Sequence, residues 1–176
     1  MFFTQSEQYD SLVHGQEGRP ADYPVIEPYP ELLFFIQRNQ NINTVIYELN
    51  HLPGEILNLN DPIKISWMYF DENRNTTVKE LNYIQKKLAY GYHHRVISNE
   101  LIEFRFVSYD QMNFYLAKEN KKHFRVFSRF GSKTVEISFI YIYAEDLGVF
   151  PQVKFVEFFG KDSSTQLPFY EKLCLP

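Results

Sequence analysis

The stretch Val135-Glu136-Ile137-Ser138-Phe139-Ile140-Tyr141-Ile142-Tyr143 decides the fold class of this chain. Every second residue from Val135 to Tyr143 is apolar or aromatic, which matches the two-residue period of a β-strand. From Phe139 onward the intervening positions are apolar as well, so this half of the strand has two apolar faces. We expect one face to fill the core, and the other to meet a helix, the N-terminal arm or a partner subunit.

The same alternation recurs on both sides of this stretch. It is found at 33–38, 45–49, 63–70, 102–106, 114–117, 124–130, 153–159 and 169–173, giving about 8–9 strands in all. Strands at such close spacing predict a mainly β protein, an antiparallel β-sandwich or flattened barrel. A parallel sheet is disfavoured because the chain offers only one crossover helix.

One α-helix is predicted at about 78–90, after the third strand. Thr77-Val78-Lys79-Glu80 matches a capping box, in which the Thr and Glu side chains satisfy free backbone amides. Gly91 stands at the position just past the helix where glycine is common. Apolar residues at spacings of three and four form a stripe that we expect to pack against one sheet, namely Val78, Leu81, Ile84 and Leu88.

The chain divides into an arm and a single domain. Residues 1–31 contain Pro20, Pro24, Pro28 and Pro30, and proline at this density neither continues a helix nor donates to a ladder. This segment is predicted to be an extended arm that is partly disordered at its start. Residues 32–176 are predicted to form one β-rich domain, a usual size for a domain.

Charge and composition exclude several classes of protein. The chain has 18 Lys and Arg against 22 Asp and Glu, a net charge of −4 that does not suit a nucleic-acid partner. The single cysteine, Cys174, allows no intrachain disulfide and is expected to be a bystander thiol. No apolar run is long enough for an integral membrane segment, and no signal peptide is recognised. The sequence fits a cytoplasmic protein or an exported protein in its mature form.

Aromatic residues make up 18% of the chain, and most of them occupy strand positions, which predicts a core rather than a site.

Charged residues at mid-strand positions allow two interpretations. The simpler one is cross-strand ion pairs on solvated faces. The other is a cavity in which arginines and stacking aromatics hold a small anionic or aromatic ligand beside a carboxylate. The predicted ligand-binding residues are Arg38, Tyr47, Trp67, Tyr69, Arg105, Arg125 and Glu157.

Other chemistry is not supported. His93 and His94 are adjacent, so on a strand their side chains would point to opposite faces and make a poor chelate; we expect a solvated turn there and no metal site. No glycine-rich phosphate loop, zinc-binding cysteine pattern or nucleophile elbow is present. No cofactor and no catalytic residue is predicted.

Several segments together resemble a known family. They include Leu33-Phe34-Phe35-Ile36-Gln37-Arg38-Asn39, 43–50, 62–63 with Trp67, 80–85, Leu88-Ala89-Tyr90-Gly91, 141–144, Gly148 and 151–160. The chain resembles the family catalogued as domain of unknown function 4833, uncharacterised bacterial proteins of about this size. The resemblance implies no activity, cofactor or catalytic residue. Members often carry N-terminal export signals, which this chain lacks.

Three functions follow from these observations. The preferred one is a non-catalytic binding or envelope-associated β-domain. No set of catalytic residues is recognised in the sequence, and the aromatic residues suit a concave surface. The second is a hydrolase or isomerase with a cavity lined by an Arg/Glu pair and aromatics. The third is a self-assembling structural protein, for which the partner would be a second copy of the chain.

Overall fold

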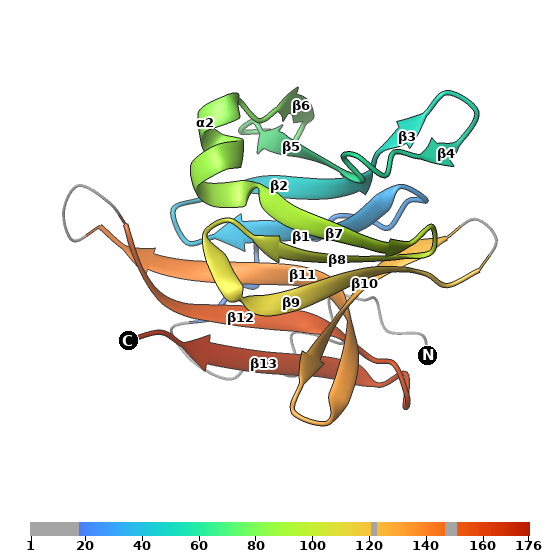
Figure 1. The fold of residues 1–176 in the computed structure, drawn as a ribbon. Coiled ribbons are helices and arrows are strands. Elements are labelled where there is room, and N and C mark those ends of the chain that lie inside the picture. Colours follow the sequence, from blue (N-terminus) through green and yellow to red (C-terminus); the bar gives the residue numbers. More distant parts are fainter. Residues whose placement is uncertain (1–17, 121–122, 147–150) are drawn as a thin grey trace, which may run out of the picture.

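The computed structural model describes residues 18–120, 123–146 and 151–176 (Figure 1). Over these residues the protein is mainly β, as the alternating pattern predicts, and a large sheet curls into a half-barrel. The strands of this sheet are β1 (Leu32–Arg38), β2 (Asn41–Leu49), β5 (Ile63–Phe70), β6 (Thr76–Glu80), β7 (Tyr92–Ser98), β8 (Leu101–Phe106), β9 (Tyr109–Lys118), β10 (Phe124–Phe130), β11 (Lys133–Glu145), β12 (Gln152–Asp162) and β13 (Pro168–Cys174). A separate hairpin is formed by β3 (His51–Leu52) and β4 (Ile56–Leu57), and the helical segments are α2 (Tyr83–Gln85) and η1 (Lys86–Tyr90).

The sheet branches at its long strand β11. β12 pairs with one edge of β11 from end to end, whereas the other edge is shared by two strands in succession. β10 pairs with β11 as far as Glu136, and β1 then pairs with it in parallel from Phe139. The register between β11 and β12 shifts between Ile137 and Phe139, where the changeover occurs, and such an irregularity increases local twist. This branch separates β7–β10 from β12 and β13 and lets the sheet curl.

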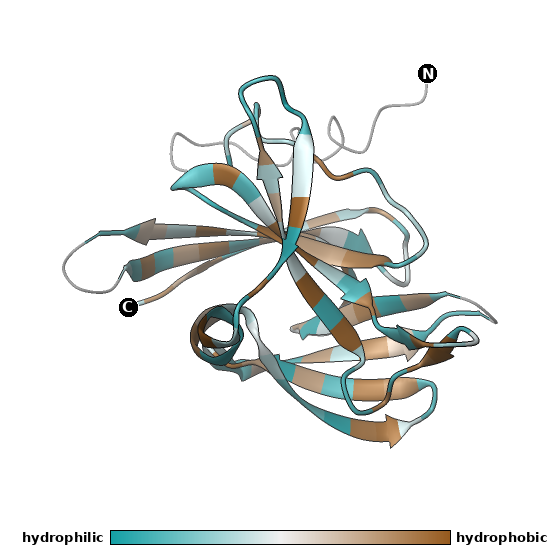
Figure 2. Ribbon diagram, turned by 90° about the horizontal axis from the view of Figure 1, so that it is seen from above, coloured by the Kyte–Doolittle hydropathy of each residue, from teal (hydrophilic) through white to brown (hydrophobic). Residues whose placement is uncertain are grey.

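Hydrophobic and hydrophilic residues alternate along several strands (Figure 2), and the buried apolar side chains form two layers. The inner layer lies inside the curl, where the rings of Phe34 and Tyr47 stack at 4.4 Å. The outer layer lies on the opposite face of β1, β11 and β12, where Phe35 and Phe139 stack at 5.0 Å. The two apolar faces predicted for the second half of β11 are therefore both buried.

The outer layer is covered by the segment before β1. Residues 18–31 form neither helix nor strand, and Tyr23, Val25 and Ile26 pack against the outer layer. The Tyr29 hydroxyl donates to Glu48 Oε1 at 2.8 Å, which fixes the end of this segment to β2. Of the three covers considered for the second apolar face, the structure shows the N-terminal arm. The predicted disorder at the start of the arm concerns residues outside the described ranges.

The helix is shorter than predicted, and the prediction that its apolar stripe packs on a sheet is wrong. Residues 76–80 form the edge strand β6, and the capping box is formed instead by Asn82 and Gln85. From Lys86 the turns widen to π-helical hydrogen bonding, which changes the spacing of residues that share a face. Val78 and Leu81 of the predicted stripe therefore lie outside the helix; Leu81 is buried, whereas Ile84 and Leu88 in the helical run are 65% and 67% exposed.

Gly91 ends the helix as predicted, but for a different reason. Its backbone is extended rather than left-handed, with φ −71° and ψ 177°. A Cβ atom at this position would lie 2.0 Å from the carbonyl oxygen of Lys86, whose hydrogen bond from the Gly91 amide closes the last turn. Close approach of the backbone, not a left-handed conformation, therefore requires glycine.

The described strands outnumber the predicted ones because several follow no alternating pattern. β3 and β4 lie between the predicted strands at 45–49 and 63–70, and β7 lies where a solvated turn was expected. Most of β7 is exposed, so its pairing with β8 depends on backbone hydrogen bonds rather than on burial of one face. His93 and His94 occupy opposite faces of this strand, and the His94 ring nitrogen Nε2 lies 3.0 Å from the Leu59 carbonyl oxygen.

Candidate functional site

A cavity of about 410 Å³ opens on the concave face of the half-barrel. Its walls come from β1, the end of the helix, β8, β9, β11, β12, and β13 with the residue that follows it. The walls are largely apolar and include Ile36, Phe106, Ile140, Ile142, Val156 and Phe158. This volume is within the usual range of about 300–1,000 Å³ for small-molecule sites.

Arg38 is the one charged side chain among the described residues that line this cavity. It is the last residue of β1 and shares the inner face with Ile36, whereas Gln37 between them faces outward. The Nε atom of Arg38 is buried and has no hydrogen-bond partner within the described chain. No described carboxylate forms an ion pair with it either.

Aromatic rings hold the guanidinium of Arg38 in place. Its Cζ atom lies 5.0 Å from the centroid of the Trp67 ring and 5.7 Å from that of Tyr90. Such contacts attract a cation to the face of an aromatic ring and orient it without neutralising its charge. Trp67 is itself 6% exposed, and its Nε1 is a second buried donor with no acceptor in the described chain.

Of the predicted aromatic residues, Trp67 contacts Arg38 directly, whereas Tyr47 is connected through Tyr90 and Tyr69 through Trp67. Tyr47 is fully buried and donates its hydroxyl to the Tyr90 carbonyl oxygen at 2.8 Å. The rings of Trp67 and Tyr90 meet edge to face at 5.3 Å, and Tyr69 lies 6.0 Å from Trp67. Burial raises the pKa of both Tyr47 and Tyr90 above the ordinary value, and Arg38 opposes this for Tyr90. Four of the seven predicted residues thus belong to one cluster.

Glu157 lies on the other face of the sheet. Along β12, Val156 and Phe158 point into the cavity, so Glu157 between them faces the outer layer, where it is 1% exposed. Its carboxylate accepts hydrogen bonds from the Tyr170 hydroxyl at 2.6 Å and from the backbone N–H of Arg19 at 2.9 Å. Glu157 therefore joins β12 to β13 and to the N-terminal arm, and it is separated from Arg38 by the sheet.

A buried polar chain continues from Glu157 along the arm. The Arg19 Nε donates to Gln37 Oε1 at 2.8 Å, and Gln37 Nε2 donates to Thr44 Oγ1 at 3.1 Å and to the Pro24 carbonyl oxygen at 2.6 Å. The Arg19 guanidinium also lies over the Phe139 ring, 5.0 Å from its centroid. These contacts give the outer face a structural role, because they connect the arm to β1 and β11 and, through the Gln37–Thr44 bond, β1 to β2.

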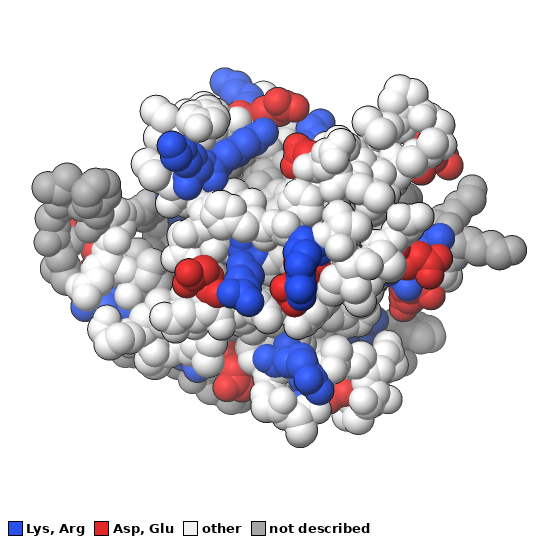
Figure 3. Space-filling model, in the orientation of Figure 1, with Lys and Arg blue, Asp and Glu red and all other residues white. Residues whose placement is uncertain are grey.

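Arg105 and Arg125 lie away from the cavity. Arg105 is exposed on β8 and donates to Asn113 on β9. Arg125 on β10 forms an ion pair with Glu136 on β11 at 3.3 Å, in a second, more polar hollow of about 430 Å³ between the arm and the sheet. On the face drawn in Figure 3, acidic and basic side chains are interspersed over the sheet. Charged pairs between neighbouring strands match the simpler interpretation of the mid-strand charges.

Tyr90 and the cavity walls were missed by sequence reasoning. The two-sided apolar pattern at 137–142 predicts that Ile140 and Ile142 share a face, but it does not reveal a hollow beside them. Nothing near Tyr90 in the sequence indicates that it meets Trp67, because the contact depends on how the helix crosses the sheet.

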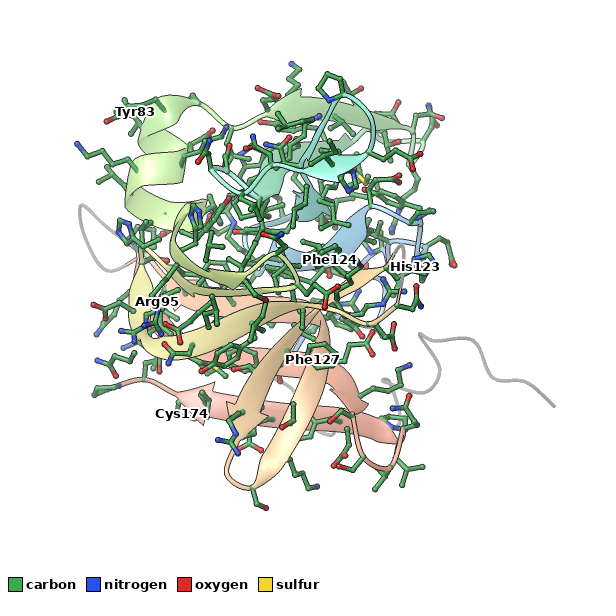
Figure 4. The ribbon with its side chains drawn as sticks, turned by 45° about the vertical axis from the view of Figure 1, so that its right-hand side comes forward. Tyr83, Arg95, His123, Phe124, Phe127 and Cys174 are labelled. Atoms are coloured by element: carbon green, nitrogen blue, oxygen red, sulfur yellow. The ribbon has the colours of Figure 1, made fainter. Side chains whose placement is uncertain are left out.

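Other groups offer little chemistry. No cluster of three metal-ligating side chains occurs within the described ranges. Cys174 is exposed on β13 (Figure 4). No helix in the described part of the chain is long and apolar enough to cross a bilayer. The cavity instead combines apolar walls with one guanidinium, an arrangement that can hold an anionic group at the end of an apolar body.

The comparisons with known proteins give one match. No curated protein and no solved structure matches the chain. The family described as "Domain of unknown function (DUF4833)" matches residues 34–172, which span all strands from the first residues of β1 into β13. This match covers most of the chain and agrees with the resemblance seen in its sequence motifs, and so the protein belongs to the DUF4833 family.

Proposed function

We propose that the protein is a binding module for a small, largely apolar molecule that carries one anionic group, with Arg38 as the anion-binding residue. The observation that carries this proposal is the buried Nε of Arg38, which has no acceptor in the described chain, at the wall of an apolar cavity. Buried donors in native proteins nearly always have a partner, so a side chain that lines a cavity and has none in the described chain points to a ligand acceptor.

The cavity walls support an apolar ligand body. Side chains such as Ile142 and Val156 stabilise a bound hydrocarbon by about 25 cal/mol for each Å² of apolar surface removed from water. A medium-chain carboxylate has this combination of an apolar body and one anionic end. The proposal is therefore specific about ligand chemistry: a carboxylate binds more tightly than the alcohol or the ammonium compound of the same chain length.

The test is titration with decanoate, decanol and decyltrimethylammonium at neutral pH. Trp67 is the single tryptophan of the chain and lies beside Arg38, so its fluorescence reports binding, with calorimetry as an independent measurement. A hydrogen bond to a charged group contributes about 1.5–3 kcal/mol. Arg38→Gln is therefore expected to weaken decanoate binding by about 10- to 150-fold, while decanol binding changes less than about threefold.

Two further variants complete the design. Arg105→Gln makes the same chemical change at the exposed position of β8 and should leave both affinities unchanged. Val156→Phe fills the cavity and should weaken decanoate and decanol alike, whereas Val96→Phe on exposed β7 should not. The proposal is overturned if decanoate shows no preference over decanol, or if Arg38→Gln and Arg105→Gln behave alike.

A further inference from the structure

The helix next to the cavity presents apolar side chains to solvent. Tyr83, Ile84 and Leu88 are 74%, 65% and 67% exposed, and they occupy one face of the continuous helical run through α2 and η1. Tyr83 projects from the helix away from the rest of the molecule (Figure 4). Isolated exposed apolar residues are ordinary, but three on one helical face form an unpartnered patch.

Basic residues accompany this patch. Lys87 lies on the same face, with its Nζ 5.7 Å from the centroid of the Tyr83 ring, and Lys86 precedes it. No acidic residue occurs from Asn82 to Tyr90. Figure 3 shows basic side chains at the upper left, over the position of α2 in Figure 1. The patch is thus locally positive on a chain whose net charge is −4.

The patch is continuous with the mouth of the cavity. Leu88, Ala89 and Tyr90 line the cavity, and Leu88 is also the most exposed apolar residue of the π-helical segment. A surface that receives Ile84 and Leu88 would therefore lie next to the opening.

We propose that this helical face, formed by Tyr83, Ile84 and Leu88 with Lys86 and Lys87, docks on the surface of an anionic lipid bilayer. Helices that lie in the interface of a membrane combine apolar and aromatic residues on one side with lysines that reach the headgroups. Lysine stems can lie along apolar surface while the ammonium groups stay with the lipid phosphates. The proposal goes beyond the proposed function, because it concerns the surface beside the cavity and holds whether or not the cavity binds a ligand.

A second copy of the chain fits this face less well. A two-fold contact would place the same patch against itself and would bring Lys86 and Lys87 of both copies together. Three side chains from one short helix also provide much less area than the roughly 800 Å² per partner of a stable interface. Anionic lipid instead satisfies both the apolar residues and the lysines.

The test is co-sedimentation of the full chain with vesicles. Binding is expected to vesicles of phosphatidylcholine mixed with phosphatidylglycerol, to be much weaker with phosphatidylcholine alone, and to fall with added salt because the lysine contribution is screened. Replacing Ile84 and Leu88 with serine is expected to reduce partitioning by about tenfold per side chain. Lys86→Gln with Lys87→Gln is expected to reduce it by about fivefold per lysine.

Matched variants separate this face from general stickiness. Leu167→Ser and Ile56→Ser remove equally exposed apolar residues far along the chain, and Lys64→Gln removes a lysine from β5; none should alter partitioning. The changed residues are exposed except Lys86, which is half-buried, and thermal unfolding should confirm that the variants fold. Equal losses from the helix variants and the Leu167 and Ile56 variants would overturn the proposal, as would binding that ignores lipid charge.

Two outcomes distinguish the alternatives. Light scattering that shows a dimer of the free chain, lost on replacing Ile84 and Leu88, would assign the face to self-association instead. The Arg38→Gln variant should sediment with vesicles as the unchanged protein does, because Arg38 does not belong to the helical face. Failure of decanoate binding therefore leaves this proposal standing, and failure of vesicle binding leaves the cavity proposal standing.

Discussion

Replacing Tyr170 with phenylalanine removes a single oxygen atom from the buried polar chain under the N-terminal arm. The Tyr170 hydroxyl donates to Glu157 Oε1 at 2.6 Å, the short distance typical of a hydrogen bond to a carboxylate. Burial, together with this hydrogen bond, raises the pKa of Tyr170 above the ordinary tyrosine value. The hydroxyl therefore stays protonated and donates throughout the neutral range.

The expected loss of stability follows from the surroundings of the acceptor. Glu157 is 1% exposed, so water does not readily replace the lost donor. A hydrogen bond to a charged group contributes about 1.5–3 kcal/mol, and the partial exposure of Tyr170 favours the lower part of that range. We expect the free energy of unfolding to fall by about 2 kcal/mol, and Tm by about 4–8 °C for a chain of this length.

The assay is urea unfolding of the full chain, with a matched control and a double-mutant cycle. Tyr83→Phe makes the same change at a 74% exposed position and should alter stability by less than about 0.5 kcal/mol. In a Glu157→Gln background the acceptor is neutral, so Tyr170→Phe should cost only about 1 kcal/mol. The reasoning is refuted if Tyr170→Phe costs no more than Tyr83→Phe, or if its cost is the same in both backgrounds.

Three further predictions follow from local geometry. Burial, followed by the hydrogen bond to Asp61, raises the pKa of Tyr92; the folded state then holds this proton more tightly, so stability is full below pH about 10 and falls above it. Tyr92→Phe should flatten that alkaline fall in unfolding experiments. A Cβ atom at Gly160 would lie 2.1 Å from a carbonyl oxygen of β11, so Gly160→Ala should cost about 3 kcal/mol in urea. Gly131→Ala, in an open turn with φ +58°, should cost only about 1–2 kcal/mol, and the reverse order would contradict this account. Asn82→Ala removes the helix cap and should cost about 1 kcal/mol in the same assay, and no loss would show that the cap contributes nothing.

The fold class was predictable from the sequence because successive side chains of a strand point to opposite faces. A buried face therefore appears as an apolar residue at every second position. The alternation around Phe139 correctly predicts a strand buried on both sides. The helix was only partly predictable. Its C-terminal end at Tyr90 is confirmed, but the helix begins only at Tyr83, so Val78 and Leu81 do not continue the predicted stripe. Ile84 and Leu88, the two stripe residues in the helix, face solvent.

The candidate site was likewise predictable only in part. Alternation places Arg38 on the face opposite Gln37 in β1, and the residue types Arg, Trp and Tyr indicate stacking. Alternation also places Glu157 between the cavity-facing Val156 and Phe158, which is why it cannot join Arg38. The sequence could not predict this separation, because it does not indicate which face of β12 lies on the same side of the sheet as Arg38 on β1.

By itself, the sequence determined that the chain forms a sheet of apolar, aromatic strands with one helix near Tyr90, because backbone period and side-chain size are local properties. The tertiary structure decided how β11 shares one edge between β10 and β1, and hence which residues meet across the curl. The cavity beside Arg38 and the burial of Glu157 under the arm depend on that branching. Strand register and branching are set by contacts between residues far apart in the chain. The alternation of residues along a single strand therefore does not indicate them.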